Sequence, residues 1–142
     1  MKALGIDPGT ATTGYGILEG EADNLKIVDY GCIKTSSKES SSDRLKKIHA
    51  DVVKLISKHK PECIAVERLF FGQNTTTAMS VGQARGVVIL AASQAGLDIF
   101  EYTPLQVKMA LTGYGRADKK QMQQMVKTLL KMNYIAGFSQ FK

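Results

Sequence analysis

The chain has 142 residues, of which 44% are hydrophobic and 23% are charged. This length suffices for one compact domain whose core needs neither disulfides nor a structural metal. No stretch approaches the roughly 20 apolar residues of a membrane span, and the N-terminal apolar run is too short for a signal peptide. These features exclude a membrane protein and lead us to expect a cytoplasmic one.

The net charge of +6 and the pI of 9.3 favour a polyanionic partner. Lysine and arginine side chains placed along phosphates displace condensed counterions and raise affinity without reading a base sequence. Charge alone supports a nucleic-acid partner only weakly, because many basic domains bind none. Other residues must therefore carry the functional argument.

The first part of the chain predicts three strands. Residues 2–7 form an apolar run that ends in Asp7, and Pro8-Gly9 then signals a turn. Residues 14–19 and 25–35 carry β-branched and aromatic side chains and are separated by a polar stretch. Three consecutive strands linked by hairpins are the expected structure.

A serine-rich loop over residues 36–42 separates these strands from a predicted amphipathic helix. From Asp43 onward, apolar residues recur at spacings of three and four, which is typical of a helix with one buried face. We expect Ser42 to cap this helix, with the Asp43 carboxylate favourable at its positive end. Pro61 ends the helix.

The remaining part alternates strands and helices. Residues 63–66 form a continuous apolar run that suits a buried parallel strand, and residues 78–95 carry small apolar residues at helical spacing. Residues 98–102 predict a fifth strand, and residues 104–111 and 118–131 predict two further helices. The sequence thus predicts an α/β fold in which a mixed five-stranded sheet has helices on both faces.

Two acidic residues stand where such a sheet places its ligands. Asp7 and Glu67 each follow an apolar strand, and the carboxyl ends of neighbouring parallel strands meet at one edge. Magnesium prefers oxygen ligands, and two ions about 3.5–4 Å apart can activate water and stabilise the leaving oxygen in phosphodiester hydrolysis. Without further context, a turn aspartate and a solvated strand-end glutamate would explain the pair better than a metal site.

Four segments together resemble one known family. They read LGIDPGTATTGYGIL, CIAVERLFFGQN, SVGQARGVVILAA and EYTPLQVKMALTGYGRADKKQMQQMVKTLL. They look like the RuvC type of Holliday-junction resolvase, and the similarity runs from the first strand to Lys131. The GQARG element and the QVK element with its following glycine and lysine are specific to that family.

The resemblance implies a ribonuclease-H-like fold and a crossover junction endodeoxyribonuclease. Such an enzyme is a homodimer that nicks four-way junction DNA symmetrically with Mg²⁺, for which Mn²⁺ can substitute, and that works beside a branch-migration motor complex. Asp7 and Glu67 match catalytic acids that bind the metal. Phe70 matches an aromatic residue that stacks on bases or wedges among them at the crossover. Lys108 and Lys119 match basic residues held near the scissile phosphate. Arg85 of the GQARG element stays unassigned.

The chain departs from the family after Lys131. We expect residues 1–131 to form the resolvase domain and residues 132–142 to be a divergent tail that replaces an acid-rich final helix. Ser139 and Lys142 stand about where acids belong, so we expect weak cleavage or none. Loss of that helix should uncover apolar surface on the sheet and reduce stability unless aromatic and aliphatic residues of the tail cover it. Those residues are Tyr134, Ile135, Phe138 and Phe141.

Three alternatives remain open at this point. The segment GIDPGTATTGYGIL also fits the phosphate-binding hairpin of the actin and sugar-kinase superfamily, although one domain leaves no room for the second half of such a protein. A non-catalytic module that binds branched DNA would differ from the enzyme only in metal-dependent turnover. A related nuclease with the same fold could instead act on another branched or RNA substrate.

Overall fold

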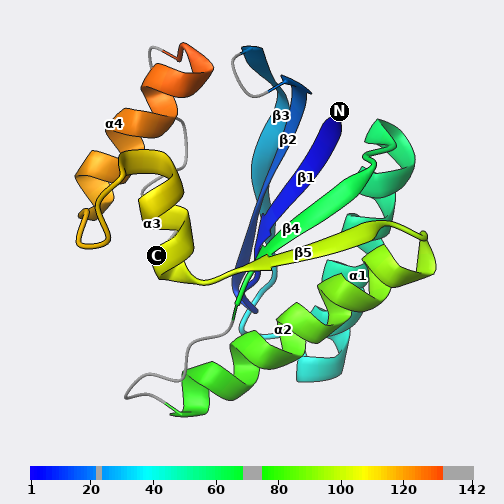
Figure 1. Cartoon of the computed structure of the whole chain (residues 1–142). Coiled ribbons are helices and arrows are strands. Elements are labelled where there is room, and N and C mark those ends of the chain that lie inside the picture. Colours follow the sequence, from blue (N-terminus) through cyan, green and yellow to red (C-terminus); the bar gives the residue numbers. More distant parts are fainter. Residues whose placement is uncertain (22–23, 69–74, 133–142) are drawn as a thin grey trace.

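A computed structural model describes residues 1–21, 24–68 and 75–132 of the chain (Figure 1). Five strands and four helices alternate much as the sequence predicts. The strands are β1 (Lys2–Asp7), β2 (Thr12–Glu21), β3 (Asn24–Lys34), β4 (Cys63–Glu67) and β5 (Asp98–Tyr102). The helices are α1 (Ser41–His59), α2 (Thr75–Gln94), α3 (Pro104–Thr112) and α4 (Lys119–Leu130).

All five strands form one sheet in the order β3-β2-β1-β4-β5. Strand β1 lies at the centre, antiparallel to β2 on one side and parallel to β4 on the other. β3 continues the antiparallel half, and β5 continues the parallel half. The predicted mixed five-stranded sheet is therefore confirmed, and its central strand is the one that ends in Asp7.

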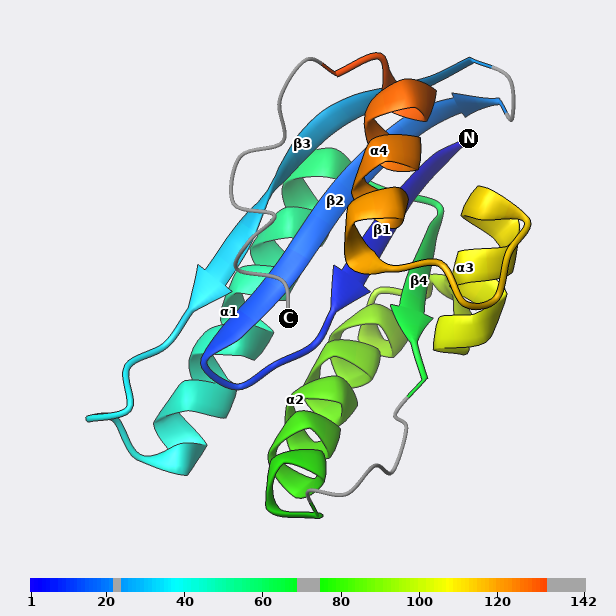
Figure 2. The same cartoon turned by 90° about the vertical axis from the view of Figure 1, so that its left-hand side faces the viewer.

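Helices α1 and α2 cover one face of the sheet, and α3 and α4 lie on the other (Figures 1 and 2). The side chains of a strand alternate between the two faces, so every second residue of β1 and β4 points toward α1 and α2. Leu4 and Ile64 are fully buried on that side, where they join Val52 of α1 and Val88 of α2 in the core. This face is closely packed with branched aliphatic side chains.

The opposite face presents mainly small residues near its centre. Gly5 of β1 is paired with Gly16 of β2 and with Ala65 of β4, and Ala3 lies on the same face two residues earlier. Between this surface and α4 remains a cavity of about 490 Å³, which Val126 and Leu130 of α4 help to line. Neither α3 nor α4 contains a buried residue. The second face is thus only partly covered by the described residues.

The helix caps explain where the helices begin. Ser40, and not Ser42 as predicted, caps α1, because its backbone is extended and its hydroxyl accepts a hydrogen bond from the Asp43 amide. Several successive serines can all serve as caps, so the helical periodicity could not select among them. Thr103 and Asp118 cap α3 and α4, each with a glutamine three residues later in a capping box.

Both cysteines are free thiols; Cys63 is buried and Cys32 is partly exposed. Among the helices that the structure describes, none is both long enough and apolar enough to cross a lipid bilayer.

Candidate functional site

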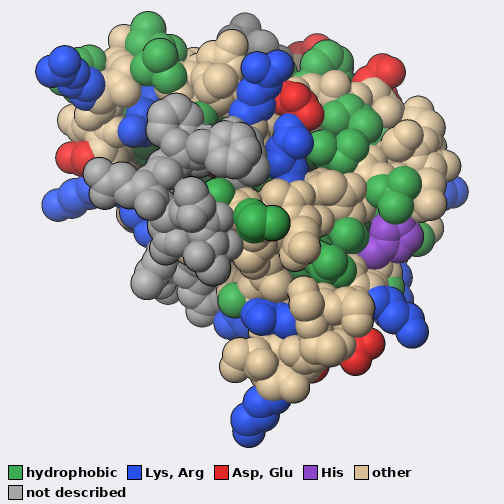
Figure 3. All heavy atoms as spheres, turned by 90° about the horizontal axis from the view of Figure 1, so that it is seen from below, with side chains coloured by type: hydrophobic (Ala, Val, Ile, Leu, Met, Phe, Trp, Pro, Cys, Tyr) green, Lys and Arg blue, Asp and Glu red, His purple; other side chains and the backbone are tan. Residues whose placement is uncertain are grey.

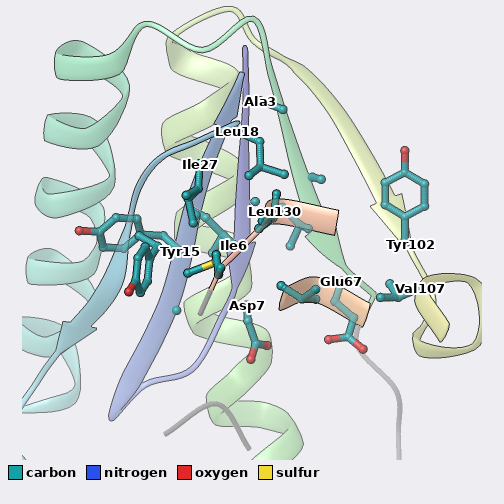
Figure 4. A pocket seen from close by; sticks show the side chains of 18 residues that line it. Ala3, Ile6, Asp7, Tyr15, Leu18, Ile27, Glu67, Tyr102, Val107 and Leu130 are labelled. Atoms are coloured by element: carbon teal, nitrogen blue, oxygen red, sulfur yellow. The ribbon is translucent and has the colours of Figure 1, made fainter. Parts of the chain in front are cut away.

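Asp7 and Glu67 come together at the carboxyl ends of the two central parallel strands. Ile6 of β1 is paired with Val66 of β4, and each acid is the next residue of its strand. Because Ile6 and Val66 belong to the core, Asp7 and Glu67 point to the opposite face. Figure 4 shows both carboxyl groups projecting from the strand ends into the same open space, and both residues line the 490 Å³ cavity.

The two carboxyl groups influence each other electrostatically. Burial raises the pKa of Asp7. Burial also raises the pKa of Glu67, the negative charge of Asp7 raises it further, and the ammonium group of Lys108 opposes the rise. Two partly buried like charges are costly when no cation lies between them. The pair therefore has the chemistry of a cation site, namely hard oxygen ligands that a divalent ion would stabilise in their charged form.

The predicted basic residues lie on the helices beside this cavity. Lys108 belongs to α3, and its effect on Glu67 places its charge close to the acidic pair. Lys119 is the first residue of α4 and is exposed to solvent. No carboxylate of the described residues forms an ion pair with either lysine. Both ammonium groups are thus available to an anionic ligand, and their roles stay predictions.

Several residues singled out in the sequence lie outside the described part of the chain. They are Phe70, Tyr134, Ile135, Phe138, Ser139, Phe141 and Lys142. Within the described residues, no group of three or more histidine, cysteine or acidic side chains gathers as metal ligands. The acidic pair fits one magnesium ion that keeps waters and shares a substrate phosphate, whereas two ions would need more oxygen ligands.

Arg85, which the sequence left unassigned, secures the end of β4. Its guanidinium Nη2 donates a hydrogen bond to Glu101 Oε1 at 2.5 Å, and its Nε donates to the backbone oxygen of Glu67 at 3.4 Å. Only 19% of the Arg85 side chain is exposed. Arg68 makes a weaker contact with Glu101, with 3.5 Å between Nε and Oε2. The sequence could not give Arg85 a role, because its partners lie on two strands, β4 and β5, that are distant from it in the chain.

The turn after Asp7 is fixed by hydroxyl groups. Thr13 is fully buried, and its Oγ1 donates to the backbone oxygen of Gly9 at 2.6 Å while accepting from the Gly9 amide at 3.3 Å. A Cβ atom at Gly9 would lie 2.3 Å from the backbone oxygen of Thr12, so only glycine fits this turn. The turn holds the backbone on which the Asp7 carboxyl group depends.

Comparison with known proteins shows which family the sequence matches. The protein-family model described as crossover junction endodeoxyribonuclease RuvC matches residues 3–137. The RuvC protein of Halothermothrix orenii is 56% identical over 135 residues, which make up 95% of this chain and 82% of that protein. The RuvC protein of Alkaliphilus metalliredigens is 56% identical over 132 residues, covering 93% and 80% of the two chains.

Solved structures are similar in fold as well. Thermus thermophilus RuvC in complex with a Holliday junction substrate superposes with a TM-score of 0.90 and 34% sequence identity, covering 99% of this chain and 88% of that one. The yeast mitochondrial Holliday junction resolvase Ydc2 gives a TM-score of 0.66 at 14% identity over 92% and 62% of the two chains, and this likeness concerns the fold alone. The predicted ribonuclease-H-like fold is confirmed.

Proposed function

The chain belongs to the RuvC family of crossover junction endodeoxyribonucleases, and we propose that it binds four-way junction DNA and cleaves it by metal-dependent hydrolysis at Asp7 and Glu67. One observation carries this assignment of the site: the two carboxyl groups end adjacent central strands and border the same cavity. The raised pKa of both groups supports it, because buried acids that repel each other favour a bound cation.

The proposed cofactor is Mg²⁺, with Mn²⁺ as a substitute. When bound, the metal would supply a polarised water molecule and would stabilise charge on the phosphate oxygens. Asp7 and Glu67 would hold it through their carboxylate oxygens, and the hydrogen bond from Arg85 would fix the backbone of Glu67. Lys108 and Lys119 would attract the scissile phosphate, and Phe70 would contact bases at the crossover.

The same site supports slow cleavage. Two acids hold magnesium less firmly than the larger ligand sets that two-metal hydrolysis uses, and the described residues add no third histidine, cysteine or acidic side chain to the pair. We propose that residues 1–131 form the resolvase domain and residues 132–142 a divergent tail without the missing acids. The chain would then recognise junctions in the cytoplasm better than it cleaves them.

A homodimer is part of this proposal, because two symmetric nicks require two active sites. Helix α2 carries an exposed apolar stripe suited to a second copy of the chain. Met79 and Leu90 are 71% and 51% exposed, and a Cβ atom added at Gly86 would meet nothing within 4 Å. Spacings of seven and four residues place the three on one helix face. A branch-migration motor complex is proposed as a further partner on the family resemblance alone.

A cleavage assay with matched variants tests the proposal. The full chain is incubated with a labelled four-way junction and with linear duplex of the same sequence, in Mg²⁺ or Mn²⁺. We expect preferential binding of the junction and slow, symmetric nicking. Asp7→Asn and Glu67→Gln should each reduce the nicking rate about 100-fold or more, because metal charge stabilisation is worth several kcal/mol. Asp98→Asn, at the other end of β5, should change little.

Four outcomes would each contradict a separate part of the proposal. Equal affinity for junction and linear duplex would refute junction recognition. Nicking as fast as that of a relative with all its acids would refute the proposed impairment. Metal-dependent nicking that survives Asp7→Asn or Glu67→Gln would refute the site. Binding without any nicking would identify a non-catalytic junction-binding module.

A further inference from the structure

A second cavity of about 400 Å³ lies next to the candidate metal site, on the other side of the β1–β2 turn. Asp7 borders both cavities, so the two sites adjoin through one side chain. The walls of the second cavity come from the turn, from α1 and from α2. The residues that line it include Gly9, Thr10, Thr12, Arg44, Ser80 and Val81.

A chain of hydrogen bonds holds the guanidinium group of Arg44 in place at this cavity. Arg44 Nε donates to Thr35 Oγ1 at 2.8 Å, and Thr35 Oγ1 donates to the backbone oxygen of Thr10 at 2.5 Å. Thr10 Oγ1 in turn donates to the backbone oxygen of Ser80 at 3.0 Å. The guanidinium group is therefore tied through the turn to α2. Such an arranged cation loses little conformational entropy when it binds an anion.

The charge of Arg44 is not neutralised within the described part of the chain. None of the ion pairs formed by described residues includes Arg44. Asp7 is the acid among the described residues that line the cavity, and it is the residue proposed to bind the metal. Thr12 adds a hydroxyl group to the lining, whereas the Ser80 hydroxyl is hydrogen-bonded to Thr10 Oγ1. An arginine beside a hydroxyl group is a donor set that contacts phosphate oxygens in protein–DNA complexes.

The surroundings also suit a polyanion. Figure 3 views the end of the molecule at which the β1–β2 turn lies, and lysine and arginine side chains lie mainly around the margin of the visible face, with some acidic side chains among them. The polar lining differs from that of the first cavity, where glycine, alanine and aliphatic side chains dominate. The second cavity therefore suits a charged ligand over much of its lining, whereas the first is polar mainly at Asp7 and Glu67.

We propose that the second cavity binds a backbone phosphate of the DNA strand next to the phosphate that is cleaved, with Arg44 as the residue that contacts it. This inference rests on the proposed function and adds a subsite to it. Because Asp7 separates the cavities, a strand whose scissile phosphate lies at Asp7 and Glu67 carries a neighbouring phosphate to Arg44. The subsite would fix the register of the strand without reading its bases.

A neutral-phosphate scan tests the subsite in the full-length chain. Junctions carrying one methylphosphonate at each position near the crossover are bound in Ca²⁺. For the unmodified chain we expect a loss of affinity at one position beside the cleaved bond. Arg44→Gln should weaken binding of the all-phosphate junction about 10-fold, lower the salt dependence by about one phosphate contact, and remove the sensitivity at that position.

Matched variants separate the subsite from general effects of charge and folding. Lys46→Gln removes the same charge from an exposed position of the same helix and should leave the scan unchanged. Arg44→Lys keeps the charge and should keep most of the salt dependence. Thr35→Val loosens the guanidinium group and should weaken binding with the salt dependence intact. Equal melting temperatures would show that the variants fold.

Two results would overturn the subsite. One is an Arg44→Gln scan with the same sensitive position as the unmodified chain. The other is an equal loss of affinity for Arg44→Gln and Lys46→Gln, which would indicate a diffuse charge effect. Binding of inorganic phosphate that Arg44→Gln abolishes, without any change in the junction scan, would assign the cavity to free phosphate instead. Failure of the unmodified chain to prefer junctions would refute the proposed function itself.

Discussion

The two faces of the sheet differ in how they are packed. Toward α1 and α2, the sheet presents Leu4, Ile17 and Ile64, which are all fully buried. Toward α3 and α4 it presents small residues and a cavity of about 490 Å³. The acidic pair lies at the end of the second face. The comparison teaches that one face supplies stability, while the other leaves room at the strand ends for ligands.

Neighbouring residues of β2 should show the largest difference between the faces. Ile17 is fully buried toward α1 and α2, whereas Leu18 is partly exposed and borders the cavity. Ile17→Ala should lower the free energy of unfolding by about 2–5 kcal/mol, because it leaves a hole in a packed core. Leu18→Ala should cost roughly 1 kcal/mol, since its surroundings are already open. Urea unfolding of both variants measures the difference, and equal losses would contradict the comparison.

Filling substitutions should have opposite effects on the two faces. Ala84 of α2 is fully buried, so Ala84→Leu should overpack the core and cost about 1–3 kcal/mol. Ala3 borders the cavity near α4, so Ala3→Leu should raise the free energy of unfolding by about 1 kcal/mol. Thermal unfolding monitored by circular dichroism checks both. A loss of stability in Ala3→Leu would show that the cavity is filled by other parts of the protein.

At the strand ends, we expect Arg85 to matter for metal affinity because it contacts the backbone of Glu67. Arg85→Met should raise the dissociation constant for Mn²⁺ about 10-fold, because a group that positions a ligand typically affects metal affinity by that factor. Arg85→Lys should restore part of it. Arg68→Met is the matched control: Arg68 also contacts Glu101, but 61% of its side chain is exposed, so the effect should be small. Calorimetric titration measures all three, and equal effects of Arg85→Met and Arg68→Met would contradict the positioning role.

The smallest expected effect is on how the free energy of unfolding depends on pH when no metal is bound. Since burial raises the pKa of Asp7 and Glu67, the folded chain binds more protons than the unfolded chain just above the ordinary carboxyl pKa of about 4. Stability should therefore fall as the pH rises through the interval up to the raised values. Asp7→Asn should reduce this slope. Adding Mg²⁺ should also reduce it, because the metal stabilises the charged form.

Much of the fold could be predicted from the sequence because its signals are local. The apolar runs that become β1 and β4 end in acids, and the fold that they imply makes them neighbours. The cap of α1 could not be predicted in the same way, because Ser40 and Ser42 offer the same hydroxyl group. The residue type does not distinguish the two serines as helix caps. The structure does, because the backbone of Ser40 is extended and its hydroxyl accepts a hydrogen bond from the Asp43 amide.

The site was predicted less completely than the fold. Asp7 and Glu67 were predicted because they end strands and match the catalytic acids of the family that the sequence resembles, whereas the contacts that support them join distant parts of the chain. Arg85 reaches Glu101 on β5, and Arg44 reaches Thr35 beyond β3. In the sequence, Arg85 could be a cation of the helix surface or part of a DNA-binding face, and nothing distinguishes Arg44 from other basic residues. Only the packing of helices on the sheet brings their partners within hydrogen-bond distance.

The position of Asp7 between two cavities has a thermodynamic consequence. A metal ion bound at Asp7 would compensate the negative charge that this side chain brings to the neighbouring cavity. The metal and the DNA strand would therefore bind cooperatively. Linkage requires that the factor by which Mg²⁺ raises affinity for the junction equal the factor by which the junction raises affinity for Mg²⁺. Even a weak metal site would then fill on the correct substrate and stay largely empty elsewhere.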